Sequence, residues 1–250
     1  MTPKLCFIHA AGADHTQWQL QRRYFASHGF ETDTVDLPGH GREPGPPQGS
    51  IEASADWLID RLDGTPVHLV GSSMGALVAL ESAARRRDLV LSLALLGVGE
   101  SMRVHPDLLD AARDDDPLAI DLMVSWCIAR DAHAGGHPTP GLWIMGATRR
   151  ILERQDPGVL YNDLAACDAY RGALEAAQAV TCPTLFLVGD GDVMTRPSGA
   201  ESLIAAIDGA VSVVIPGAGH FAMIEQPDTV IDELAAFLDN GAGRERQWAS

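Results

Sequence analysis

The chain has 250 residues, 18 basic and 34 acidic side chains, a formal net charge of −16 and a hydrophobic share of 46%. This length fits one large domain, or one core with an insertion, and the apolar share suffices for a sizeable buried core. The acidic balance argues against nucleic acid and anionic membranes as main partners, because both attract lysine and arginine patches.

The compartment is inferred from the N-terminus and the cysteines. The first apolar run, Leu5–Ala11, is too short for a signal peptide, and no stretch reaches the roughly 18 apolar residues of a membrane span. The four cysteines are scattered without a CxxC pair, which is typical of reduced, buried thiols. We therefore expect a cytoplasmic protein. The sequence carries no signal for its oligomeric state.

Short apolar runs alternate with stretches of helical period along most of the chain. The predicted strands are, in chain order, Leu5–His9, Glu31–Asp36, Pro66–Gly71, Leu89–Leu96, Thr184–Gly189 and Ala210–Pro216. The predicted helices span about residues 16–28, 51–63, 74–86, 198–207 and 227–239. This alternation predicts an α/β fold: a mostly parallel sheet of about six strands with helices on both faces.

The alternation stops between about Ser101 and Cys182, where helix-like stretches are cut by prolines and a glycine pair. An excursion of roughly 80 residues between two strands of one sheet is improbable as a structureless loop, so it must pack as a helical layer. We expect a core of residues 1–101 and 183–250 with an inserted helical cap of residues 102–182. A frayed end is expected after Asn240.

A glycine-flanked serine follows the third predicted strand. Residues 71–75 read GSSMG, which matches G-x-S-x-G, and a helix-like stretch comes directly after them. A nucleophile on a strand-to-helix turn needs small residues two before and two after it, because the backbone there is strained and crowded. Gly71 and Gly75 meet that need and make Ser73 the candidate nucleophile. Ser72 is assigned a flanking role.

A serine hydroxyl does not ionise near neutral pH, so Ser73 needs a base, and the base needs an orienting acceptor. His220 is the candidate base, since it lies in the glycine-rich loop after the last predicted strand. The candidate acid is Asp192, in the loop after the fifth strand, and Asp190 two residues upstream is its near rival. Glu100, which follows the fourth strand, is a more distant rival.

A tetrahedral oxyanion needs two donors, and backbone N–H groups supply them without reorganisation. Met74, the residue after the candidate nucleophile, offers one such group. The second is expected from the loop after the first strand, where Ala11 is preferred and Ala10 is the alternative.

The order and spacing of these segments resemble the α/β-hydrolase superfamily, and within it the small capped serine hydrolases. Residues 36–42 (DLPGHGR) resemble that family's D-x-P-G-H-G loop, and residues 189–192 (GDGD) its G-x-x-D acid turn. Residues 217–227 (GAGHFAMIEQP) resemble its G-x-G-H-x-x-x-x-E-x-P segment. The match covers most of residues 4–101 and 183–238.

The resemblance supports Asp192 over Asp190, and it places His9 and His40 at positions that are structural in the family. Two departures are visible. The family's usual His-Gly pair after the first strand is His9-Ala10 here. Because the sequence starts almost at that strand, we expect the family's N-terminal β-hairpin to be absent and the sheet to have about six parallel strands.

These residues predict a carboxylesterase-like serine hydrolase without a cofactor, acting on a small-molecule substrate. We expect it to cleave a carboxylic ester or thioester of a small, largely uncharged acyl group through an acyl-enzyme. The net charge favours neutral or cationic substrates unless the cap overrides it locally. The alternatives are a hydrolase of a C–C bond in a diketone-like ring-fission product and a non-turnover binding or receptor module.

Other patterns in the cap are weaker. A metal site at His133 and His137 is disfavoured, because two glycines between them oppose a helix and no third ligand completes the set. Four large side chains could line an acyl pocket, although such residues more often form the cap's own core: Met123, Trp126, Trp143 and Met145. For the C–C alternative, four polar residues are candidates to bind a substrate carboxylate: Arg130, Arg149, Arg150 and Asn162.

Overall fold

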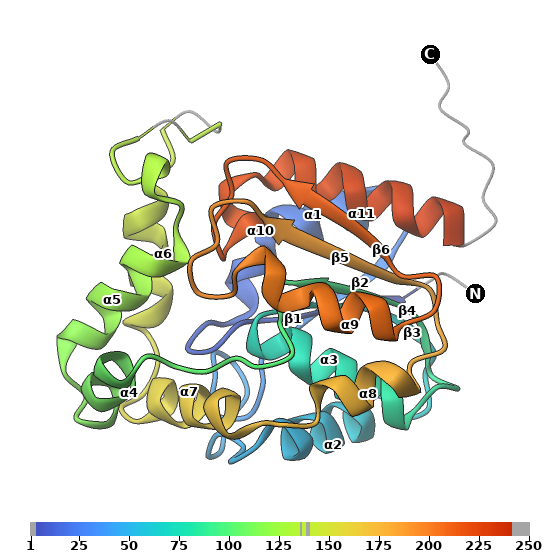
Figure 1. The fold of residues 1–250 in the computed structure, drawn as a ribbon, viewed down its shortest axis with the longest axis horizontal. Coiled ribbons are helices and arrows are strands. Elements are labelled where there is room, and N and C mark those ends of the chain that lie inside the picture. Colours follow the sequence, from blue (N-terminus) through green and yellow to red (C-terminus); the bar gives the residue numbers. More distant parts are fainter. Residues whose placement is uncertain (1–3, 136, 139–140, 242–250) are drawn as a thin grey trace.

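The computed structural model describes residues 4–135, 137–138 and 141–241, and its centre is a six-stranded parallel sheet (Figure 1). The strands are β1 (Lys4–Ile8), β2 (Glu31–Val35), β3 (Val67–Ser72), β4 (Val90–Leu96), β5 (Thr184–Gly189) and β6 (Val211–Ile215). Their order is β2-β1-β3-β4-β5-β6, and every neighbouring pair is parallel. The predicted α/β class and the six strands are confirmed.

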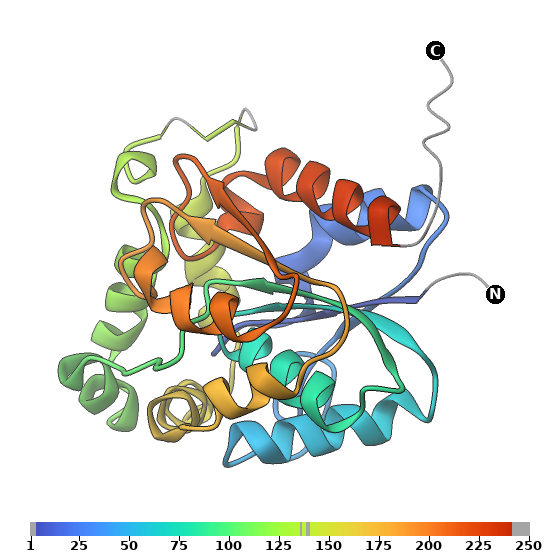
Figure 2. The ribbon, with the colours of Figure 1, turned by 45° about the vertical axis from the view of Figure 1, so that its right-hand side comes forward.

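Two helical layers cover the sheet (Figures 1 and 2). One layer packs α1 (Gln19–Ser27), entered through the 3₁₀ turn His15–Trp18, against α11 (Pro227–Gly241). The other is a continuous row of α2 (Ile51–Leu62), α3 (Met74–Arg85), α8 (Ala173–Ala179) and α9 (Glu201–Ala206), with the 3₁₀ turn Pro197–Ala200 ahead of α9. Because both faces are covered, β1, β3 and β5 are almost wholly buried, which explains their continuous apolar runs.

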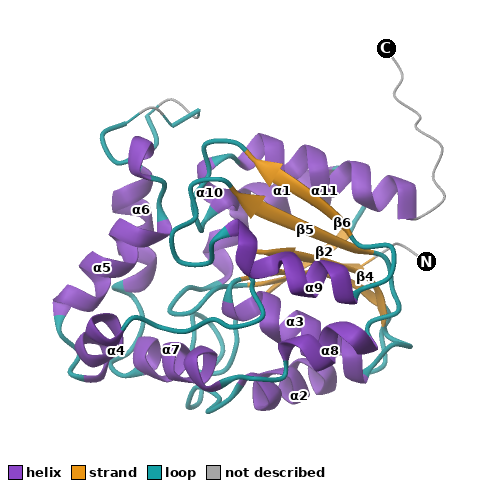
Figure 3. Ribbon diagram, in the orientation of Figure 1, coloured by secondary structure: helices purple, strands orange, loops and turns teal. Residues whose placement is uncertain are grey.

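A group of helices follows β4 and stands off one end of the sheet (Figure 3). It comprises α4 (Pro106–Arg113), α5 (Pro117–Cys127), the 3₁₀ turn Arg130–Ala132, α6 (Ile144–Leu152) and α7 (Val159–Ala169). Two prolines that interrupt the sequence pattern begin α4 and α5, where a missing N–H costs nothing. Although α8 falls within residues 102–182, it packs on α3 in the layer beside the sheet.

The two ends of the chain, the absence of membrane spans and the state of the cysteines were also predicted from the sequence. Of the end expected to fray after Asn240, residues 242–250 lie outside the described residues, as do residues 1–3 of the predicted core. Within the described residues, no helix combines the length and the apolar character that crossing a membrane would require. All four cysteines are unpaired, and three of them are buried.

Candidate active site

Ser73 lies on a strained turn between β3 and α3. Its backbone has φ 53° and ψ −117°, a left-handed conformation that a residue with a Cβ rarely adopts. The flanking glycines make this turn possible, since a Cβ on Gly71 would overlap the carbonyl of Gly75. A Cβ on Gly75 would lie 2.5 Å from the carbonyl oxygen of Ile8 on β1. The glycines of the motif are therefore required by close backbone packing.

A buried carboxylate orients the imidazole of His220. The Nδ1 atom of His220 lies 2.8 Å from Oδ2 of Asp192, and both side chains are almost fully buried. The other carboxylate oxygen, Oδ1, accepts the backbone N–H groups of Met194 at 2.9 Å and Thr195 at 2.8 Å. Because those bonds fix the carboxylate, Oδ2 is left to face His220, and Nδ1 donates to it.

Neither rival acid forms a hydrogen bond with His220 in the described part of the chain. Asp190 uses Oδ1 to accept the N–H of Gly217 at 2.8 Å, so it closes the turn between the two loops. Glu100 is exposed, and its backbone N–H donates to the carbonyl of Gly199. The geometry favours Asp192 among the three acids that the sequence left open.

The loop that carries His220 is held by the end of α5. The carbonyl of Cys127 accepts the N–H of His220 at 2.8 Å and that of the next residue at 3.1 Å. Glu225 accepts the N–H of Gly219 at 2.9 Å with one oxygen and the N–H of Ala129 at 2.7 Å with the other. Burial raises the pKa of Glu225 to about 7 despite these donors. The loop therefore depends on a segment from the inserted helices.

Gly97, which follows β4, leaves room for the imidazole. A Cβ at this position would lie 3.0 Å from both Nδ1 and Cε1 of His220, and the φ of Gly97 is +59°. A lone glycine after a strand carries no specific signal, so the sequence gives no sign that Gly97 belongs to the site.

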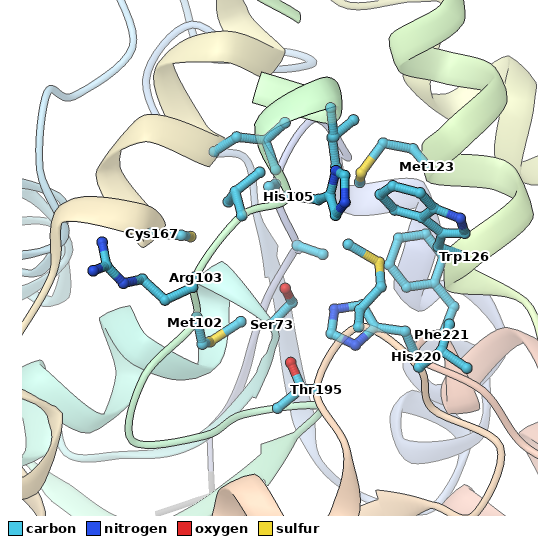
Figure 4. A pocket seen from close by; sticks show the side chains of 17 residues that line it. Ser73, Met102, Arg103, His105, Met123, Trp126, Cys167, Thr195, His220 and Phe221 are labelled. Atoms are coloured by element: carbon cyan, nitrogen blue, oxygen red, sulfur yellow. The ribbon is translucent and has the colours of Figure 1, made fainter. Parts of the chain in front are cut away.

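Ser73 and His220 line one cavity of about 460 Å³ (Figure 4). The wall is mostly apolar, and His105, Met123 and Trp126 lie across the cavity from Arg103 in this view. Among the described residues that line the cavity, none is an aspartate, glutamate or lysine, and Arg103 is the one arginine. The lining residues are Ala10, Ala11, Ser73, Met102, Arg103, Val104, His105, Leu108, Met123, Trp126, Leu164, Cys167, Val193, Met194, Thr195, His220 and Phe221.

Two backbone N–H groups near Ser73 are uncommitted. The N–H of Ala10 donates to Oε1 of Gln17 at 2.9 Å, and that of Gly12 donates to Oδ2 of Asp163 at 2.8 Å. The N–H groups of Ala11, between them, and of Met74, at the start of α3, make no hydrogen bond within the described part of the chain. Ala10 is thus a poor oxyanion donor, and Ala11 is the better one.

His9 and His40 are buried beside this loop, away from the cavity lining. Nε2 of His9 accepts the N–H of Leu37 at 3.0 Å, and burial, together with the nearby His40, lowers the pKa of His9 to about 4. Nε2 of His40 lies 2.8 Å from Asp163, and its Nδ1 faces the carbonyl of Pro38 at 3.0 Å. These contacts suit the structural roles that the family resemblance implied.

The cap residues named from the sequence divide into two groups. Met123 and Trp126 line the cavity, whereas Trp143 is 70% exposed and Met145 does not belong to the lining. None of the four polar candidates reaches it: Arg130, Arg149, Arg150 and Asn162. Arg149, for example, pairs with Asp121 on α5. The cation that does line the cavity, Arg103, was missed, because its surrounding sequence has no motif.

His133 and His137 each face a backbone carbonyl, that of Ile128 at 3.0 Å and that of Ile224 at 2.7 Å. Among the described residues, no three metal-ligating side chains come together.

The parallel sheet, the strained serine turn and the buried aspartate–histidine pair define a class of protein, the α/β hydrolases. A model of the Alpha/beta hydrolase family matches residues 7–233, so the chain belongs to this family.

Individual relatives span nearly the whole chain. A pimeloyl-[acyl-carrier protein] methyl ester esterase of Neisseria meningitidis is 32% identical over 234 residues, covering 87% of this chain and 86% of its own length. A 2-hydroxy-6-oxo-6-(2'-aminophenyl)hexa-2,4-dienoic acid hydrolase of Metapseudomonas resinovorans is 26% identical, covering 94% and 83%. Among solved structures, a thermophilic esterase superposes with a TM-score of 0.77 at 28% identity, covering 95% and 90%.

Proposed function

We propose that this protein is a serine hydrolase that cleaves a carboxylic ester or thioester of a small acyl group. Ser73 is the nucleophile, His220 is the general base and Asp192 orients the imidazole. The observation that carries the proposal is the buried 2.8 Å contact between Asp192 and His220, whose ring lines the same cavity as the strained Ser73.

In this mechanism Ser73 Oγ attacks the carbonyl carbon and passes its proton to Nε2 of His220. Asp192 accepts the Nδ1 proton of His220 and stabilises the imidazolium that forms. The N–H groups of Ala11 and Met74 donate to the oxyanion. Collapse of the tetrahedral intermediate breaks the ester bond, and His220 returns the proton to the leaving alcohol or thiol. Water then attacks the acyl-enzyme by the same route and frees Ser73.

The cavity suits a small and largely apolar substrate. Its volume of about 460 Å³ lies in the range usual for small-ligand sites, and Leu108, Met123 and Trp126 supply apolar wall. We propose that α4 to α7 act as the cap that closes this cavity. Since no carboxylate lines it, a preference for cationic substrates, which the net charge of the chain suggested, has no local support. Neutral or singly anionic esters fit better.

Activity-based labelling tests the assignment. A fluorophosphonate should modify Ser73, as located by mass spectrometry, and Ser73→Ala should lose both labelling and turnover, the latter by about 10⁴-fold or more, with an unchanged fold. A panel of esters, thioesters, lactones and amides then identifies the leaving group. Turnover without labelling of Ser73 would overturn the proposal, and neither labelling nor turnover would favour a binding module.

A second candidate is hydrolysis of a C–C bond in a diketone-like acid. It is favoured by the likeness to the Metapseudomonas resinovorans hydrolase and by Arg103, which lines the cavity. A substrate carboxylate would compete there with Asp168, whose Oδ2 lies 3.7 Å from Nη1 of Arg103. The relative turnover of a nitrophenyl acetate and of a vinylogous diketo acid decides between the two. We expect the nitrophenyl ester to be the better substrate.

A further inference from the structure

A buried aspartate of α7 reaches across to the loop after β1. Asp163 is 2% exposed, and its Oδ2 accepts the N–H of Gly12 at 2.8 Å, a contact between residues 151 positions apart in the sequence. The same oxygen lies 2.8 Å from Nε2 of His40. One carboxylate oxygen from the inserted helices therefore holds two loops of the core.

The hydrogen bond from the N–H of Gly12 to Asp163 helps to fix the direction of the N–H of Ala11, the preceding residue. On one side of Ala11, the N–H of Ala10 donates to Gln17; on the other, the N–H of Gly12 donates to Asp163. The N–H of Ala13 closes the turn onto the carbonyl of Ala10 at 3.1 Å. The carbonyl of Ala10 lies in the same planar peptide unit as the N–H of Ala11, and it accepts the N–H of Ala13 and, at 2.9 Å, Nδ1 of His9. Because this unit is held directly and Asp163 holds the unit that follows it, the N–H of Ala11 has one orientation.

Gly12 also packs closely under α7. Its φ is +63°, and a Cβ at this position would lie 2.7 Å from Cδ1 of Leu160, one turn before Asp163 on the same helix. The loop and the helix thus meet through both a hydrogen bond and close packing. A shift of α7 would move the Gly12 peptide with it.

The carboxylate of Asp163 also interacts with the buried imidazole of His40. Although burial acts against the imidazolium, the hydrogen bond and the charge of Asp163 raise the pKa of His40 above its ordinary value. Both ring nitrogens of His40 face acceptors, Nδ1 the carbonyl of Pro38 and Nε2 the Oδ2 atom of Asp163, so the protonated ring donates to both. A carboxylate oxygen that faces Nε2 of His40 on one side is well placed to accept the N–H of Gly12 on the other.

We propose that Asp163 is a positioning residue for catalysis: from α7 it fixes the Gly12 peptide and so aims the N–H of Ala11 at the oxyanion. This inference rests on the proposed function. It assigns a second task to the inserted helices, because the oxyanion site is complete only when α7 is seated on the loop after β1.

The test compares Asp163→Ala and Asp163→Asn with a matched control, Asp115→Asn. Asp115 also accepts a glycine N–H, that of Gly158, at 2.8 Å just before α7, but it touches neither the cavity nor the loop after β1. The measurements are kcat and KM for the best ester. Two inhibition constants complete the set, one for a trifluoromethyl ketone, which forms an oxyanion on Ser73, and one for the same ketone without fluorine.

Asp163→Ala should lower kcat by about 10- to 100-fold, less than the 10²- to 10³-fold cost of deleting an oxyanion donor, because the N–H of Ala11 is displaced and not removed. Inhibition by the trifluoromethyl ketone should weaken by the same factor, while KM and the fluorine-free ketone change by less than about threefold. Asp163→Asn keeps an oxygen that can accept the N–H of Gly12, so its kcat and its inhibition by the trifluoromethyl ketone should lie between those of the wild type and Asp163→Ala. Asp115→Asn should match the wild type.

Unchanged kcat in a folded Asp163→Ala would overturn the inference, as would equal weakening of both ketones, which indicates a general loss of structure. If Asp163→Ala does not fold, wild-type kcat and wild-type inhibition in Asp163→Asn would overturn it instead. Failure of the wild type to hydrolyse esters or to be labelled at Ser73 would refute the proposed function, and this inference with it. Labelling and turnover in the wild type separate the two failures.

Discussion

Replacing Asp192 by asparagine should inactivate the enzyme while leaving its fold intact. The side chains have the same shape, and the amide oxygen of the variant can still accept the N–H groups of Met194 and Thr195, now at 2.9 and 2.8 Å from Oδ1. When the amide oxygen faces these two N–H groups, the NH₂ group of the asparagine points toward Nδ1 of His220. Nδ1 must then accept, so the ring proton moves to Nε2, and His220 can no longer take the proton of Ser73.

The expected cost follows from this wrong tautomer. In serine hydrolases of this design the change lowers kcat by about 10⁴-fold, which corresponds to about 5 kcal/mol of transition-state stabilisation. Because binding does not involve Asp192 directly, KM for a nitrophenyl ester should stay within about threefold of the wild type. The assay is steady-state hydrolysis, with near-ultraviolet circular dichroism and thermal unfolding to show that the variant is folded.

Asp190→Asn is the matched control, since Asp190 lies two residues upstream and accepts a single N–H, that of Gly217, at the surface. It should keep at least about half of the wild-type kcat, because surface substitutions away from special features cost little. The reasoning is refuted if Asp192→Asn stays within about tenfold of the wild type. It is equally refuted if Asp190→Asn loses as much activity as Asp192→Asn.

Two further predictions concern the buried acid Glu225 and Arg103 of the cavity lining. Because the pKa of Glu225 rises from 4.5 to about 7 in the folded protein, this group stabilises the fold below pH 4.5 and loses that contribution as the pH rises through 7. Urea unfolding should therefore show the wild type losing up to about 3 kcal/mol relative to Glu225→Gln across that window, and a gain would contradict the assignment. Arg103→Gln should raise KM by about three- to fivefold for the monomethyl ester of a dicarboxylic acid, in low salt, but not for a neutral ester of equal length. Equal effects on both esters would exclude charge recognition by Arg103.

Much of the site could be predicted from local sequence. The need for glycine at positions 71 and 75 can be predicted from the sequence, because the backbone crowding there involves residues close to Ser73 and the neighbouring strand β1. The strand β5, which precedes the loop of Asp192, is predictable because a strand covered on both faces is almost continuously apolar. The strand β6, which precedes the loop of His220, is also largely apolar, although it lies at the edge of the sheet and most of its residues are not buried. The loops at the carboxyl ends of such strands converge, which explains why residues far apart along the chain could be assigned to one site.

Only the tertiary structure decided which N–H of the loop after β1 is free and which cation lines the cavity. For the acid, the family resemblance already favoured Asp192, and the structure adds its contact with His220. Asp190 and Asp192 differ little in local sequence, and only the packing of the loops after β5 and β6 gives them different partners. Asp163 shows the reason most clearly. Its partner Gly12 is 151 residues away, and the geometry of that contact depends on how α7 docks, which no local pattern encodes.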